Sequence, residues 1–191
     1  AVGFAHGVMN TDNMSILGET FDYGPFGFLD EYNPRFICNH SDYSGRYAFD
    51  QQPNIGLWNC NALAHALSPL IPIETLREIL QGYQPIIEQH YLQLMRAKLG
   101  LQTAQADDSA LIGKLLALLQ QFAVDYTIFF RRLCGFSTQT NNASIRDLFI
   151  DRESFDQWAA QYRSRLQQEN SHDALRRERM QRSNPKYILR N

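Results

Sequence analysis

Apolar side chains recur every three or four residues through most of the chain after residue 54, which is the spacing of amphipathic helices. This periodicity predicts helices over residues 55–67, 73–82, 85–99 and 153–168, and one long helix from the polar cluster 107–109 to Gly135. Gly100 marks a helix end, and Asp107 and Asp108 are candidate N-caps for the long helix. The pattern therefore indicates a mainly α-helical fold.

Two segments carry a more specific expectation: the 55–67 helix and the stretch 175–182. Leu57, Cys60 and Leu63 share one face of the 55–67 helix, so we expect this helix to be buried. The stretch 175–182 is basic and rich in helix formers. It suits either a patch that contacts phosphate or acidic groups, or a solvated helix or a tail that packs on a segment outside this sequence, and we favour the second interpretation.

Residues 25–53 keep neither the helical nor the strand period. The segment is rich in Gly, Asn, Asp and aromatic residues, and a loop of this length inside a compact domain is usually functional or mobile. Arg35 and Arg46 are candidates for contacting phosphate or an acidic substrate. The alternative is an ordinary surface loop whose arginines form surface salt bridges.

The stretch from His6 to Gly24, HGVMNTDNMSILGETFDYG, concentrates the candidate chemistry. Residues 14–17 and 20–21 predict two short strands joined by a bend at Gly18, a hairpin that would bring Asn13 and Asp22 to the same end. An amide oxygen beside carboxylates suits a hard cation such as Mg²⁺, which takes oxygen ligands and often shares its shell with phosphates. Asp-Asn runs are also common turn formers, so a purely structural turn stays open as the alternative.

The same stretch resembles the catalytic loop of protein kinases. Asn13 lies seven residues after His6, as in the pattern H-R-D-x-x-x-x-N, and the residues 22–24 (DYG) are similar to D-F-G with Tyr in place of Phe. Val8 stands where a kinase has its catalytic Asp, and a carboxylate reappears at Asp12.

Longer strings make the resemblance more specific. HGVMNTDNMSILGETFDYGPFGFLDEYNPRF and the later NIGLWNCNALAHAL resemble the SelO (YdiU) family, whose members are kinase-fold protein adenylyltransferases once described as pseudokinases. The resemblance covers the chain from about Gly3 to its end. It implies a mainly α fold: the large helical lobe of a protein-kinase-like fold, with short β-hairpins near the catalytic loop.

The resemblance also implies an organisation of the chain. We expect one domain over residues 1–191, with catalytic and metal-binding loops in 1–24, an activation-like segment in 25–53 and a helical subdomain in 54–191. A kinase-like enzyme carries a Gly-rich phosphate loop and its Lys in an N-terminal lobe, and neither pattern occurs in this sequence. We therefore expect a C-terminal-lobe fragment that is inactive alone.

The function implied by the resemblance is metal-dependent transfer of AMP from ATP to Ser, Thr or Tyr hydroxyl groups of protein substrates. Asn13 and Asp22 are the expected ligands of Mg²⁺ or Mn²⁺, and Asp22 is also the expected nucleotide-binding residue. The resemblance assigns Asp12 as the general base, whereas we expect His6 only to hold the loop through hydrogen bonds. Two alternatives stay open: γ-phosphoryl transfer of the kinase type, and a non-catalytic pseudokinase scaffold, which Val8 favours.

Composition and charge limit the classes of binding partner that we expect. The 191 residues are 44% hydrophobic with a formal net charge of −2, which suits a domain with its own core and gives no support for a nucleic-acid partner. No apolar run is long enough to span a bilayer and no signal-peptide pattern opens the chain, so we expect no membrane partner.

The cysteine content bears on the compartment. Cys38, Cys60 and Cys134 fit neither a disulfide framework nor a zinc site and indicate a reducing compartment. We take this to be the cytoplasm of a bacterium, or the mitochondrion of a eukaryote. SelO family members end in a Cys-containing motif, and the resemblance suggests a redox link between that motif and Cys38; the alternative is a free thiol.

Overall fold

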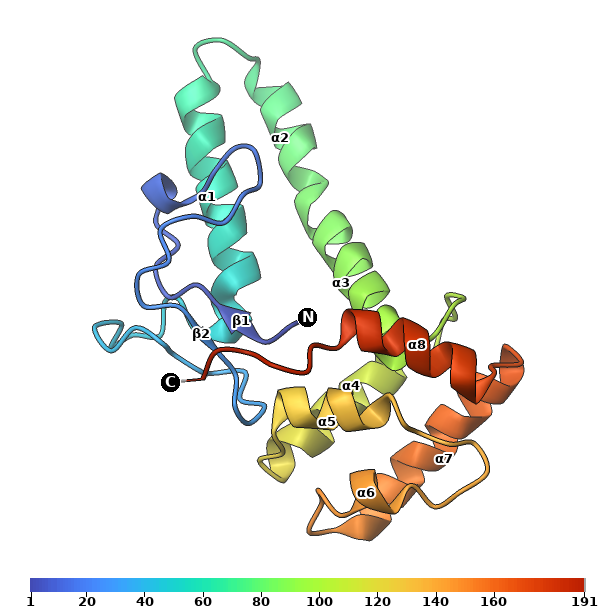
Figure 1. The fold of residues 1–191 in the computed structure, drawn as a ribbon. Helices are drawn as coiled ribbons and strands as arrows, with labels where there is room; N and C mark the ends of the chain where they lie inside the picture. Colours follow the sequence, from blue (N-terminus) through green and yellow to red (C-terminus); the bar gives the residue numbers. More distant parts are fainter. Residues whose placement is uncertain (191) are drawn as a thin grey trace. The chain divides into compact units, whose positions relative to one another are not determined.

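The computed structural model describes residues 1–190 and is mainly helical, with one small two-stranded antiparallel sheet (Figure 1). The expectation of a mainly α fold is therefore confirmed. The described residues form two compact units: one contains 4–28 and 34–90, and the other contains 1–3, 29–33 and 91–190. Within residues 1–190, no helix combines the length and the apolar character that crossing a bilayer requires.

The first unit holds the sheet and a helical hairpin. Its elements are β1 (Phe4–Ala5), a 3-10 helix (Thr11–Asn13), β2 (Gly27–Phe28), a second 3-10 helix (Phe49–Gln51), α1 (Gln52–Leu67), α2 (Ile73–Gln81) and the beginning of α3 (Tyr83–Leu99). In Figure 1, α1 and α2 run side by side in opposite directions. Helix α1 ends at Leu67, as the sequence predicted, and Pro69 and Pro72 lie in the bend that follows it.

Helix α1 forms where expected, but the expectation that its apolar face is buried is wrong. Its buried residues are Ile55, Gly56 and Asn59, whereas the Leu63 side chain is 45% exposed and that of Trp58 is 51% exposed. The helix packs through the first half of its length, where the Tyr83 hydroxyl donates to the Pro53 carbonyl oxygen at 2.9 Å. Helical spacing identifies which face is apolar, and it does not establish that another element covers that face.

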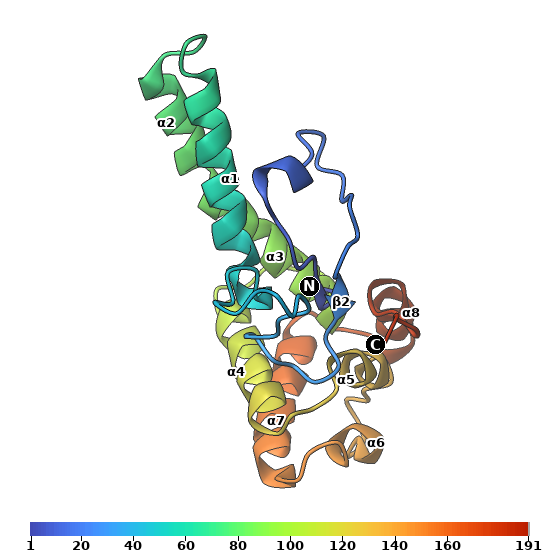
Figure 2. The ribbon, with the colours of Figure 1, turned by 90° about the vertical axis from the view of Figure 1, so that its left-hand side faces the viewer.

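The second unit is built around an aromatic core. Its helices after α3 are α4 (Asp108–Gln121), α5 (Tyr126–Leu133), α6 (Ala143–Arg146), α7 (Arg152–Gln168) and α8 (Asp173–Ser183). Figure 2 shows α4 beside α7, and the indole nitrogen of Trp158 on α7 donates to the Leu111 carbonyl oxygen on α4 at 3.1 Å. The apolar face expected for the 153–168 helix is confirmed, with Phe155, Trp158 and Tyr162 buried.

The long helix expected from residue 109 to Gly135 is two helices. Helix α4 ends in a Schellman arrangement, in which the N–H of Val124 donates to the Leu119 carbonyl and the N–H of Ala123 donates to the Gln120 carbonyl. Ala123 has a φ of +48°, a left-handed value that a helix does not tolerate. Asp125 then caps α5 by accepting the N–H of Ile128 at 2.7 Å, so the break has its own capping signals.

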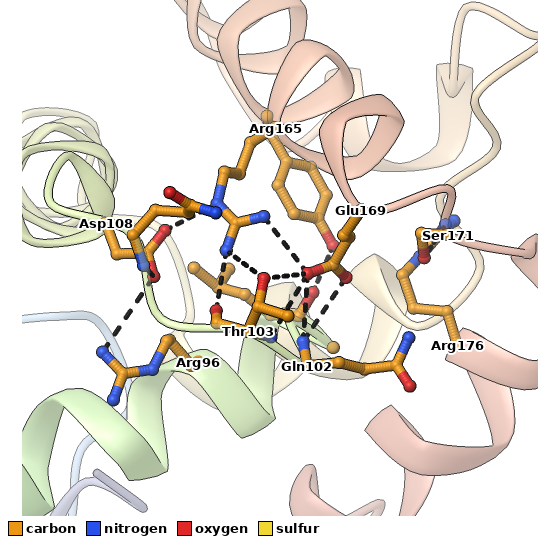
Figure 3. A network of polar contacts seen from close by, with 12 residues as sticks. Arg96, Gln102, Thr103, Asp108, Arg165, Glu169, Ser171 and Arg176 are labelled. Carbon is orange, nitrogen blue, oxygen red and sulfur yellow. Dashed lines mark hydrogen bonds and ion pairs between the residues drawn. The ribbon is translucent and has the colours of Figure 1, made fainter.

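Asp107 and Asp108 were candidate caps, but Asp107 stands at the N-cap of α4 without a side-chain cap hydrogen bond, and Asp108 is the first residue of the helix. Asp108 has a different role. Its carboxylate is 1% exposed and accepts Nε of Arg165 at 2.7 Å. The same guanidinium reaches Glu169 at 3.1 Å and the Thr103 carbonyl at 2.7 Å (Figure 3). This network attaches the loop after Gly100 to α7, and the helix end expected at Gly100 is confirmed, with a φ of +70°.

The basic stretch 175–182 is not a solvated tail throughout. It lies in α8, and Arg176 is fully buried, donating to the Phe136 carbonyl and to Asp173 at 2.9 Å. Met180 is also buried one turn further on. Basic composition therefore conceals two core positions at helical spacing.

Candidate functional site

The candidate site is the loop that leaves β1 and returns at β2, drawn in dark blue in Figure 2. The two strands pair antiparallel, with Phe4 opposite Phe28 and Ala5 opposite Gly27. Because this pairing fixes both ends of the loop, the candidate residues between His6 and Gly24 all lie in one closed loop.

The hairpin expected inside this loop is absent from the described residues. Residues 14–17 and 20–21 are not strands; Ser15–Gly18 forms a turn in which the Gly18 N–H donates to the Ser15 carbonyl at 3.1 Å. The bend expected at Gly18 is confirmed, with a φ of +74°. Ile16 is 86% exposed, so its strand propensity finds no packing surface that would stabilise a strand.

His6 holds the loop closed, as the sequence predicted. Its ring Nε2 lies 2.9 Å from the Phe21 carbonyl oxygen, next to Asp22, and its Nδ1 lies 3.4 Å from the backbone nitrogen of Val8. A carbonyl oxygen only accepts and a backbone N–H only donates, so these contacts fit the neutral tautomer with its proton on Nε2. The buried ring thus joins the first residues of the loop to its return.

Asp12 and Asn13 belong to the 3-10 helix, which the Asn13 N–H closes by donating to the Asn10 carbonyl at 3.0 Å. The Asn13 side-chain nitrogen donates to the Val8 carbonyl oxygen at 3.1 Å. One of the two N–H groups of its amide is therefore used, which fixes the side chain, and its Oδ1 is the atom that can accept or bind a cation. Asn13 is half-buried, whereas the Asp12 side chain is exposed.

Asp22 occupies an unusual backbone conformation on the return of the loop. Its φ is +53°, in the left-handed region where Asp and Asn are enriched among non-glycine residues. The Gly24 N–H donates to the Asp22 carbonyl oxygen at 2.8 Å, which closes a tight turn. The side chain is exposed, so neither candidate carboxylate is used to hold the protein interior together.

A cavity of about 270 Å³ lies inside the first unit at this loop. Its lining includes His6 and Asn13, and it also includes Glu19, a carboxylate that the sequence analysis did not single out. Asp12 and Asp22 are not among its lining residues. The structure thus brings Asn13 and Glu19 to one cavity, while the two candidate aspartates face solvent.

The donor set suits one kind of metal ion better than others. Among residues 1–190, no three His, Cys, Asp or Glu side chains gather as a potential metal cage. Mg²⁺ is usually held by one or two carboxylates together with water and phosphate oxygens, so it does not require such a cage. The exposed carboxylates and the Asn13 oxygen are hard donors of that type.

Long-range contacts from α1 and the 34–53 segment, which were not predicted from the sequence, secure the loop. Gln52 accepts the His6 N–H at 3.0 Å and donates to the Phe4 carbonyl at 3.0 Å. Asn59, which is buried, donates to the Met9 carbonyl at 2.9 Å. These partners are more than forty residues away in the sequence, and no local pattern signals them.

Cys38 packs under the start of the loop. Its thiol donates to the Ala5 carbonyl at 3.5 Å, and burial raises its pKa. A Cβ atom placed on Gly7 would lie 2.7 Å from the Cys38 sulfur, so the absence of a side chain at Gly7 creates room for the thiol. Cys38, Cys60 and Cys134 are all free thiols in the part of the chain that the structure describes.

Comparison with known proteins identifies close relatives of the whole chain. A family model described as "Protein adenylyltransferase SelO" matches residues 1–191. A protein named "Protein nucleotidyltransferase YdiU" from Pectobacterium carotovorum is 59% identical over 191 residues, which is all of this chain and 40% of the relative. Proteins of the same name from Pectobacterium atrosepticum and Aliivibrio salmonicida are each 58% identical over the whole chain, which spans 40% and 39% of their lengths.

Proposed function

The chain belongs to the SelO family, and on that basis we propose that the protein transfers AMP from ATP to hydroxyl groups of Ser, Thr or Tyr in other proteins. The chain spans about 40% of the length of the curated relatives that it matches, so activity, substrates and partners are proposed for the whole protein. Within the whole protein, residues 1–191 would form the larger lobe of a kinase-like fold. The observation that carries the proposal is the closed loop between β1 and β2, which presents Asp12, Asn13 and Asp22 within one segment.

We assign Asn13 and Asp22 as the residues that would hold a divalent cation, Mg²⁺ or Mn²⁺. The Val8 carbonyl occupies the Asn13 amide nitrogen, which supports the use of its oxygen as a ligand. Asp22, whose side chain is exposed, directly follows Phe21, whose carbonyl oxygen lies 2.9 Å from the His6 ring. When bound, such a cation offsets negative charge on the phosphate oxygens of ATP.

Asp12 is the proposed general base. The oxygen of the substrate hydroxyl attacks the α-phosphorus of ATP, the bond from that phosphorus to the β-phosphate oxygen breaks, and pyrophosphate leaves. The hydroxyl proton passes to the Asp12 carboxylate, which is exposed and one residue from Asn13. A carboxylate in that position does not need to be buried to reach a substrate that docks from solvent.

The test uses the complete protein and ATP labelled separately at the α and γ positions. We expect α label on protein substrates, since AMP transfer retains the α-phosphorus, and we expect Asp22→Ala to reduce it to background. Glu74→Ala, which removes an exposed carboxylate on α2, is the matched control and should transfer label like the native protein. Label from γ would instead identify a kinase, and absence of both labels would identify a scaffold.

A further inference from the structure

The two arginines of the 34–53 segment have different surroundings in the first unit. Arg35 lies 3.8 Å from the carboxylate of Asp50. The Arg46 guanidinium lies over the indole ring of Trp58, 4.8 Å from its centroid, and has no carboxylate partner among residues 1–190. Arg46 therefore carries an exposed positive charge that the described part of the protein does not neutralise.

The loop that carries Arg46 has a defined shape. The largely buried Asp42 carboxylate accepts the N–H of Arg46 at 2.9 Å and the N–H of Tyr47 at 2.7 Å. Gly45 has a φ of +68°, which the turn requires. A loop fixed by its own backbone contacts holds Arg46 outward with little conformational freedom left to lose on binding.

This loop is attached to the candidate catalytic loop. The Tyr47 hydroxyl donates to the side chain of Asn10, the residue that caps the 3-10 helix containing Asp12. The Asn39 side chain donates to the Gly7 carbonyl at 3.3 Å. On α1, the neighbour of Trp58 is Asn59, which holds the Met9 carbonyl. The loop that carries Arg46 is thus hydrogen-bonded to the loop that carries Asp12, the proposed base.

We infer that Arg46, supported by Trp58, binds an acidic side chain of the protein substrate close to the hydroxyl that receives AMP. A guanidinium stacked on an indole keeps its N–H edge available, and that edge matches a carboxylate in a bidentate arrangement. The half-exposed indole and the almost fully exposed Tyr43 in the same loop add apolar surface beside the charge. This inference rests on the proposed AMP transfer.

The experiment measures AMP transfer by the complete protein to two synthetic peptides that share one Ser and differ only in flanking Glu or Gln residues. We expect a lower KM for the Glu peptide, and about a fivefold rise of that KM in Arg46→Ala with kcat unchanged, the upper end for one exposed ion pair. Arg46→Glu should prefer a third peptide with Lys in place of Glu. Arg35→Ala is the matched control and should leave all three KM values unchanged.

Three outcomes would overturn the inference. The native protein would use the Glu and Gln peptides equally, or Arg46→Ala would raise the KM of ATP and not that of the peptide, or Arg46→Glu would fail to prefer Lys. Fluorescence anisotropy of the labelled peptides measures binding without catalysis. If no peptide receives AMP but the Glu peptide binds and Arg46→Ala weakens it, the acidic docking site stands and the proposed function fails.

Discussion

Replacing Gly7 by Ala tests whether the start of the candidate catalytic loop depends on an empty Cβ position. Gly7 has a φ of +87°, and an added Cβ would lie 2.7 Å from the Cys38 sulfur and 3.0 Å from the Pro25 carbonyl oxygen. Backbone and packing therefore both oppose the methyl group. The next residue, Val8, provides the carbonyl that holds Asn13, so a shift here should also reach the proposed metal ligands.

The expected cost has two parts. A left-handed backbone at a residue with a Cβ costs about 1–2 kcal/mol. Forcing an extra methyl group against a packed thiol and carbonyl costs about 1–3 kcal/mol more. Gly7→Ala should therefore lower the free energy of unfolding by about 2–5 kcal/mol, and it should reduce AMP transfer by the complete protein.

A double-mutant cycle isolates the contribution of the contact with Cys38. Cys38→Ala removes the sulfur at 2.7 Å but leaves the left-handed backbone and the Pro25 carbonyl oxygen, so Gly7→Ala should cost about 1 kcal/mol less in its presence. Urea denaturation of the four proteins measures this. Gly113→Ala is the matched control, because a Cβ there meets no atom within 4 Å in helix α4 and should stabilise the protein by up to about 1 kcal/mol.

If Gly7→Ala unfolds at the same urea concentration as the native protein, neither the positive φ nor the tight contact is real. If Gly7→Ala destabilises the native protein and the Cys38→Ala variant equally, the cost comes from the backbone and the Pro25 contact, and Cys38 does not lie against the loop as described.

Three further predictions concern the second unit. Arg165→Met removes the nearer cation of the buried Asp108 carboxylate and leaves Arg96, which lies 4.0 Å away, so it should destabilise by about 3 kcal/mol in urea denaturation, the lower end for a broken buried ion pair. Glu74→Ala, which removes an exposed carboxylate from the first turn of α2, should cost at most about 1 kcal/mol. Ala123→Gly should stabilise by up to about 1 kcal/mol, because glycine adopts the left-handed φ of +48° without the Cβ penalty; a loss of stability would contradict the described helix end. Burial lowers the pKa of Lys98 to about 8, below its unfolded value of 10.5, so the unfolded chain binds more protons between these pH values and stability should rise as pH increases from about 8 towards 10. Lys98→Met should remove that rise in denaturation midpoints measured from pH 7 to 10, and an unchanged pH profile would contradict the burial of the ammonium.

Local signals predicted the helices and the content of the candidate loop. Apolar spacing placed the 153–168 helix within one residue of α7, because that pattern follows directly from one buried helix face. It did not detect the end of α4 at Ala123, since the apolar period continues across the break and alanine is not a usual left-handed residue. It also missed the burial of Arg176, which donates to the Phe136 carbonyl in a distant part of the sequence.

For the candidate site too, the sequence predicted contacts between residues close in the chain and did not predict long-range contacts. The sequence placed the candidate ligands in one loop and His6 as the residue that holds it, because all of these lie within twenty residues of one another. The hairpin inside the loop was wrong, since short apolar runs form strands only where a partner and a packing surface exist. The attachments through Gln52 and Asn59 depend on α1 and appear only in the structure.

The loop separates the groups that hold it from the groups proposed to act. His6, Gln52 and Asn59 all bind main-chain atoms of the loop or its flanking strand, so its shape does not depend on the candidate carboxylates. Asp12 and Asp22 are exposed, so a metal ion or a proton can reach either carboxylate without first breaking into the protein interior. A purely structural turn would be expected to use its Asp side chains on the local backbone. The division favours a loop built for chemistry over a simple connection, and it explains why Asp22→Ala should remove activity while its cost in stability is limited to about 1–2 kcal/mol from the left-handed backbone at that residue.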